Sequence, residues 1–154
     1  MKRLFVAILI AAAALATAGS ASATTPTPVM ITGHTAFGSP GTFATTPGAG
    51  LCAAGTTTDS SLGGLFATGF QSGHGQNGHI LFHDLKTFTC GDGSGTFTAD
   101  LQVFYVFGAP TDSFSWVILR GIGAYASLHG TGSGVGVEGQ SAVDDMYTGS
   151  VHFD

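Results

Sequence analysis

The sequence predicts an all-β domain, an antiparallel β-barrel of about eight strands, with a β-sandwich as the alternative. Short runs rich in Val, Ile, Thr, Phe and Tyr alternate with turns that contain Gly and Pro. Apolar residues do not recur at the i, i+3, i+4 and i+7 spacing of an amphipathic helix. The 154 residues include 25 glycines, and strands that coil sharply around a barrel need glycine at their corners. The glycine content therefore favours the barrel.

Residues 1–23 have the three parts of a secretory signal peptide. Two cations open the segment, residues 4–18 are apolar, and Ala21 and Ala23 are the small residues that signal peptidase reads. A transmembrane helix needs roughly 20 apolar residues, so a retained membrane anchor is the weaker alternative. We therefore expect cleavage before Thr24 and a secreted, extracellular protein.

The part that remains is expected to be a flexible Thr/Pro leader at residues 24–28 and a single barrel domain at residues 29–154. It keeps Lys86 and Arg120 as cations against nine acidic side chains. Nucleic acids and anionic membranes bind through clustered Lys and Arg, so neither is an expected partner once the signal peptide is removed.

Cys52 and Cys90 are the two cysteines of the chain, and an even count in an exported protein predicts a disulfide. Closing a loop of this length removes roughly 4 kcal/mol of chain entropy from the denatured state. A redox-active or metal-binding thiol pair is the alternative, which the absence of a C-x-x-C motif disfavours.

Before Cys90, the composition predicts several strands separated by turn signals. A long loop with two prolines is expected at residues 38–50, and an irregular polar segment at residues 72–78. The predicted strands of this part are residues 29–37, 51–58, 65–70 and 79–90.

After Cys90, the clearest strand is residues 96–107, where Phe, Ala, Leu, Val and Tyr alternate with Thr, Asp and Gln. Further strands are predicted around residues 114–118 and 146–153. Glycine dominates residues 121–139, where no strand is delimited. Residues 124–128 within that segment could be a turn of helix or a bend between strands.

Residues 87–98, 115–132 and 145–152 resemble a group of small secreted bacterial proteins without assigned activity. A strand with Trp116 followed by G-x-G-A-Y-A-x-L-x-G-x-G is also similar to a turn of the allene oxide cyclase and dirigent type of barrel. The similarity implies an eight-stranded antiparallel barrel with an apolar lumen that holds a reactive intermediate. Ile122 departs from the pattern, which usually has Thr, and no catalytic residue is carried over.

Two polar clusters are candidate sites. His74, His79 and His83 are weak metal-ligand candidates, since His79 and His83 would lie some 13 Å apart on one face of a strand and are more simply solvent-facing. The second cluster could combine a carboxylate with an imidazole for acid and base chemistry, although its acidic pair is more simply a solvated turn. Its members are His129, Glu138, Asp144, Asp145 and His152.

A set of apolar side chains either fills the barrel, the reading we favour, or walls an apolar ligand pocket. Its members are Phe97, Leu101, Tyr105, Phe114, Trp116 and Tyr125. The leading functional hypothesis is a non-enzymatic barrel that binds an apolar small molecule or a surface partner. A cofactor-free cyclase or isomerase of the allene oxide cyclase or dirigent type, and a structural cell-surface protein, are the alternatives. No cofactor is expected.

Overall fold

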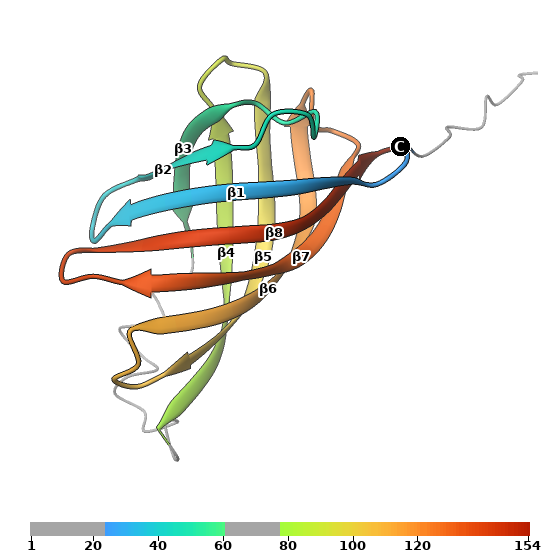
Figure 1. Cartoon of the computed structure of the whole chain (residues 1–154). Helices are drawn as coiled ribbons and strands as arrows, with labels where there is room; N and C mark the ends of the chain where they lie inside the picture. Colours follow the sequence, from blue (N-terminus) through green and yellow to red (C-terminus); the bar gives the residue numbers. More distant parts are fainter. Residues whose placement is uncertain (1–23, 61–77) are drawn as a thin grey trace, which may run out of the picture.

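The computed structural model describes residues 24–60 and 78–154, which form a closed antiparallel β-barrel (Figure 1). Each strand pairs with the next along the chain, and β8 pairs with β1, so the sheet closes on itself. The strands are β1 (Thr27–Ala36), β2 (Gly41–Thr45), β3 (Ala54–Asp59), β4 (His79–Cys90), β5 (Gly95–Val106), β6 (Thr111–Gly123), β7 (Leu128–Glu138) and β8 (Ala142–Phe153). The prediction of an all-β, eight-stranded barrel is confirmed. Within the described residues, no helix is long and apolar enough to span a membrane.

The first part of the chain differs from the sequence-based expectation at two places. Residues 38–50 were expected to be a loop, but β2 occupies their middle and pairs with both β1 and β3. Its Phe43 is 4% exposed, so packing inside the barrel stabilises a strand that is short and flanked by prolines. The expected leader also contains the start of β1, and Thr24 N–H donates to Phe153 O at 2.7 Å.

Three expectations fall on parts of the chain outside the described residues. These are the signal peptide at residues 1–23, the strand at residues 65–70, and the position of His74 in the polar segment.

Strand β7 lies within the glycine-rich segment in which the sequence delimited no strand. Its inward positions between Leu128 and Glu138 are all glycines. A Cβ on Gly132 would lie 2.7 Å from the ring of Trp116, and one on Gly134 would overlap the ring of Phe114. The glycines therefore leave room for the large rings that β6 sends inward. Residues 124–127 form the turn between β6 and β7, which agrees with the bend alternative.

The interior of the barrel divides into two halves. We call the end where β4 passes into β5 the filled half, because aromatic rings pack it. Phe88 and Phe97 are each 1% exposed and stack with ring centroids 4.7 Å apart. Phe43 meets Phe88 edge-on at 5.2 Å, and Tyr125 meets Phe97 at 5.5 Å. These contacts form a continuous aromatic core.

The predicted disulfide is confirmed and lies in the filled half. Cys52 and Cys90 are bonded and buried, and the hydroxyl of Tyr125 lies against both of them. This hydroxyl accepts a hydrogen bond from Cys52 N–H at 3.0 Å and donates to Cys90 Sγ at 3.3 Å. The bond ties the segment before β3 to the end of β4, and Tyr125 connects it to the turn between β6 and β7.

Candidate functional site

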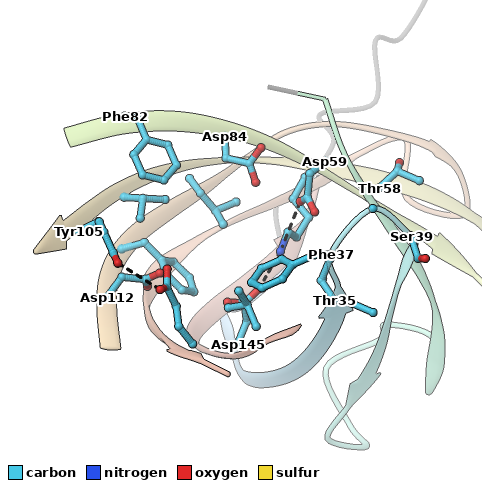
Figure 2. Close-up of a pocket in the computed structure, with 18 of the residues that line it drawn as sticks. Thr35, Phe37, Ser39, Thr58, Asp59, Phe82, Asp84, Tyr105, Asp112 and Asp145 are labelled. Carbon is cyan, nitrogen blue, oxygen red and sulfur yellow. Dashed lines mark hydrogen bonds and ion pairs between the residues drawn. The ribbon is translucent and has the colours of Figure 1, made fainter. Parts of the chain in front are cut away.

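The opposite end, where β1 turns into β2, is the hollow half and contains a cavity of about 850 Å³. The turn residues Phe37 and Pro40 lie at its rim, and Phe37 is 59% exposed. Figure 2 shows side chains from several strands converging on this space. The cavity therefore opens to solvent at one end of the barrel, and the aromatic core lies at the other end.

Most of the cavity wall is apolar. Strands β4, β5, β6 and β8 supply it through residues that alternate with outward-facing neighbours. The apolar lining includes Ile80, Phe82, Leu101, Val103, Phe114 and Val143. Such a wall favours the hydrocarbon part of a ligand over water.

A buried ionic cluster breaks this apolar lining. Lys86 is 6% exposed, and its Nζ donates to Asp145 Oδ2 at 2.7 Å. The same Nζ lies 3.4 Å from Asp59 Oδ1, and a dashed line at Asp59 in Figure 2 marks this contact. Tyr147 O–H donates to Asp145 Oδ2 at 3.0 Å. Strands β3, β4 and β8 therefore bring one ammonium and two carboxylates together inside the barrel.

The surroundings of Lys86 keep it charged. Burial alone would lower the pKa of Lys86, but the oxygens of Tyr147, Asp145 and Asp59 outweigh burial and raise it. Burial raises the pKa of Tyr147 well above its ordinary value, so this residue is a neutral phenol at pH 7. The two carboxylates are consequently the charges that balance the ammonium.

Asp59 is the member of the cluster whose protonation changes near neutral pH. Burial raises its pKa to about 6, against the opposing effect of Lys86 and with a further contribution from the charge of Asp84. Asp84 is 3% exposed and also lines the cavity. The cavity therefore holds a carboxyl group that can be either protonated or charged under physiological conditions.

Further acidic groups lie closer to the rim. Asp112 Oδ1 accepts a hydrogen bond from Gly136 N–H at 2.9 Å, and Tyr105 O–H donates to Glu138 Oε2 at 3.1 Å. Burial raises the pKa of Asp112, the hydrogen bond from Gly136 lowers it, and the charges of Asp145 and Glu138 raise it further. Asp112 therefore interacts electrostatically both with Glu138 and with Asp145 and Lys86 of the ionic cluster.

The six predicted ligand-pocket residues divide between the two halves. Leu101, Tyr105 and Phe114 line the cavity. Phe97, Trp116 and Tyr125 are not part of its lining and pack in the core instead. Alternation along a strand predicts that a side chain faces inward, but not at which height of the barrel the interior is empty.

The candidate metal ligands lie away from the cavity. His79 and His83 are exposed on the outer face of β4, where His83 Nδ1 lies 2.9 Å from Asp100 Oδ1. Among the described residues, no group of three or more His, Cys, Asp or Glu side chains is arranged to hold a metal ion.

The predicted acid–base cluster is dispersed. His129 and His152 stack on the outer surface at 5.3 Å, and His129 Nε2 lies 2.9 Å from Asp154 Oδ2. Asp144 is exposed and pairs with His34 at 2.7 Å. Glu138 and Asp145 line the cavity, but His129, Asp144 and His152 lie outside it, so no imidazole of this cluster meets a cavity carboxylate.

Asp145 corrects the expectation of a solvated turn for the acidic pair. It lies on β8, faces inward and is 8% exposed, whereas its neighbour Asp144 faces solvent. Pairing with Lys86 compensates the burial of its charge.

The ionic cluster was not predicted from the sequence, where Lys86 entered only the overall charge balance. The sequence did contain a signal for the inward position of Lys86. Alternate residues of a strand point to the same face, and one face of residues 79–90 carries Asp84, Lys86, Phe88 and Cys90. Because a disulfide cysteine is usually buried, this face is expected to point inward, and Lys86 with it.

Fold and cavity define the class of this protein as a closed antiparallel β-barrel with one filled half and one ligand-sized hollow half. No protein-family model, curated protein or solved structure matches this chain.

Proposed function

We propose that this protein binds one small, mainly apolar molecule in the hollow half of the barrel. The observation that carries the proposal is the cavity of about 850 Å³ with apolar walls and a few converging polar groups. Ligand pockets of proteins typically measure about 300–1,000 Å³ and combine these two features. Eight strands are also wide enough to enclose one small ligand.

The ionic cluster supports binding because of its position. A buried ammonium with two carboxylates is weak evidence for stability, since desolvation offsets much of the attraction within the pair. At the inner part of a cavity, however, the same groups would orient a ligand by its polar end. The aromatic core of the filled half would limit how far the ligand can enter.

A filling substitution with a matched control tests the proposal. Val103 lines the cavity, whereas Val117 is 43% exposed on the outside of the barrel. Val103→Phe should reduce the affinity for an apolar fluorescent dye by about tenfold or more, because the added ring occupies the cavity. Val117→Phe adds the same ring outside and should leave affinity unchanged.

Mass spectrometry of molecules extracted from the purified protein should also find a bound hydrophobic compound. If no such compound were found and the dye did not bind the unmodified protein, ligand binding would be excluded.

A second candidate function is proton transfer on the bound molecule, as in a cofactor-free isomerase. The observation that favours it is Asp59, a cavity carboxyl whose pKa is raised to about 6 by burial. The extracted compound should then gain deuterium when it is incubated with the protein in D₂O, and Asp59→Asn should abolish the exchange. Equal exchange in both proteins would exclude this role for Asp59.

We infer that binding takes place outside the cytoplasm. The disulfide is compatible with an oxidising compartment, and residues 1–23 have the composition of a signal peptide. Expression of the whole chain in a secreting bacterium should release a product that begins at Thr24. An intact N-terminus in the membrane fraction would contradict this inference.

A further inference from the structure

The cavity holds more negative than positive charge. Its lining contains one ammonium, that of Lys86, and a larger set of carboxyl groups. These are Asp59, Asp84, Asp112, Glu138 and Asp145. Lys86 can balance only part of this charge, and each carboxylate raises the free energy of ionising its neighbours.

The charge of Asp59 is only partly compensated within the barrel. Its side chain is 9% exposed, its Oδ1 has no short hydrogen bond but only an ion pair of 3.4 Å with Lys86, and a side-chain hydrogen bond with Asp84 raises its pKa. The nearest cation is Lys86 Nζ at 3.4 Å, which is already bonded to Asp145 at 2.7 Å. Thr35 Oγ1, also in the cavity lining, likewise has no hydrogen-bond partner among the described residues. Buried acceptors without a close donor are unfavourable, so this side of the cavity is short of positive charge and of hydrogen-bond donors.

An anionic ligand fits this arrangement poorly. The ammonium of Lys86 is engaged by Asp145 and Asp59, so an incoming carboxylate would have to displace one of them. It would also approach the charges of Asp112 and Glu138 near the rim. A cation meets the opposite conditions, because it brings both the charge and the donors that the cavity lacks.

We propose that the molecule bound in the hollow half is an amphipathic amine, whose ammonium group lies beside Asp59 and whose apolar body contacts the hydrocarbon wall. This inference rests on the proposed ligand-binding function and deepens it. The ammonium lies among the carboxylates of the lining, beside Asp59, and the apolar chain extends along Leu101 and Val103 towards the rim.

Three probes of equal chain length test the charge preference: 1-decylamine, 1-decanol and decanoate. Each is titrated into the purified protein at pH 7.5 by displacement of the apolar dye and by calorimetry. A hydrogen bond to a charged group contributes enough that the amine should bind about tenfold or more tightly than the alcohol. Decanoate should bind most weakly.

The outcomes separate the two proposals. Equal affinity for the three probes would overturn the charge preference and leave the proposed binding function in place. Tightest binding of decanoate would overturn the preference by showing that Lys86 selects the ligand. Failure of all three probes and of the dye would overturn both.

Substitutions locate the effect. Asp59→Asn should reduce decylamine affinity about tenfold, so that the ratio of decylamine to decanol affinity falls close to one. Asp92→Asn is the matched control, because Asp92 lies in the turn between β4 and β5 at the opposite end of the barrel. An unchanged decylamine affinity in Asp59→Asn would overturn the proposal.

A second substitution guards against misfolding of Asp59→Asn. Asp112→Asn keeps an oxygen for the hydrogen bond from Gly136 N–H and removes only the charge. It should lower decylamine affinity by a smaller factor, about threefold, because Asp112 lies further from the ammonium position. No change in either variant, with circular dichroism showing folded barrels, would overturn the inference.

Discussion

The filled and hollow halves of this barrel are built from the same strands by the same alternation, yet their interiors differ. In the filled half, Phe88 and Phe97 stack and the disulfide is buried behind Tyr125. In the hollow half, the inward positions carry the charged side chains around Lys86 and apolar side chains that leave a cavity between them. The aromatic core and the disulfide stabilise one end of the barrel, which leaves the other end open for the binding that we propose.

The largest expected difference between the halves comes from truncating one phenylalanine in each. Phe97→Ala should lower the free energy of unfolding by about 4 kcal/mol, because it leaves a void in a packed aromatic core. Phe82 lines the cavity and is only partly buried, so Phe82→Ala should cost about 1 kcal/mol. Denaturant unfolding of both variants measures the difference. Equal losses would show that the halves are equally packed.

Removal of the disulfide tests whether the halves are independent. The double variant Cys52→Ala/Cys90→Ala should lose about 4 kcal/mol of unfolding free energy, because the denatured chain regains its loop entropy. Dye affinity should stay unchanged under conditions where the variant is folded, since the bond lies in the filled half. A folded variant that no longer binds dye would show that the filled half shapes the cavity.

The free energy of unfolding should depend on pH because of Asp59, which lies in the hollow half. The pKa of Asp59 is raised from 3.8 to about 6 on folding, so its contribution favours the folded state at acid pH. That contribution is lost as the pH rises through 6. Relative to Asp59→Asn, the wild-type protein should lose about 2 kcal/mol of unfolding free energy between pH 3.5 and 7.5, after allowance for solvent screening through the rim.

Unfolding of both proteins by urea at each pH checks this expectation. A stability difference that is constant with pH, or that moves in favour of the wild type as the pH rises, would contradict the raised pKa.

The smallest effect comes from removing one hydroxyl in each half. Tyr125→Phe leaves the buried Cys52 N–H without its acceptor and should cost about 1 kcal/mol. Tyr105 donates to the exposed Glu138 at the rim, so Tyr105→Phe should change stability by less than about 0.5 kcal/mol. Thermal unfolding of the two variants measures both losses of stability. A larger loss for Tyr105→Phe would show that the hydroxyl in the hollow half contributes more to stability than the one in the filled half.

Much of the fold could be predicted from the sequence because it depends on local patterns. The alternation in residues 96–107 predicted an inward face, and Leu101 and Val103 are buried on β5 as that pattern requires. The β2 and β7 strands were not assigned because their local composition favours turns. Pairing on both sides stabilises them, and the glycines of β7 accommodate the rings of Trp116 and Phe114.

Less of the candidate site could be predicted. Leu101, Tyr105 and Phe114 were identified through their apolar pattern, but Asp59, Lys86 and Asp145 were not joined into one cluster. A charged residue in an amphipathic strand is ordinarily assigned to the solvent face. Its burial becomes favourable only when an opposite charge from another strand is beside it, and no local pattern contains that information.

The amino-acid sequence alone specifies an all-β chain, its approximate number of strands and the pairing of its two cysteines. These properties follow from the alternation of apolar and polar residues, from the Gly and Pro residues in the turns, and from the presence of two cysteines. Which half of the interior is empty, and that an ammonium lies among carboxylates there, follows only from the packing of the folded chain. Empty volume and buried charge depend on side chains that approach from distant parts of the chain: Lys86 and Asp145 are 59 residues apart and bonded at 2.7 Å.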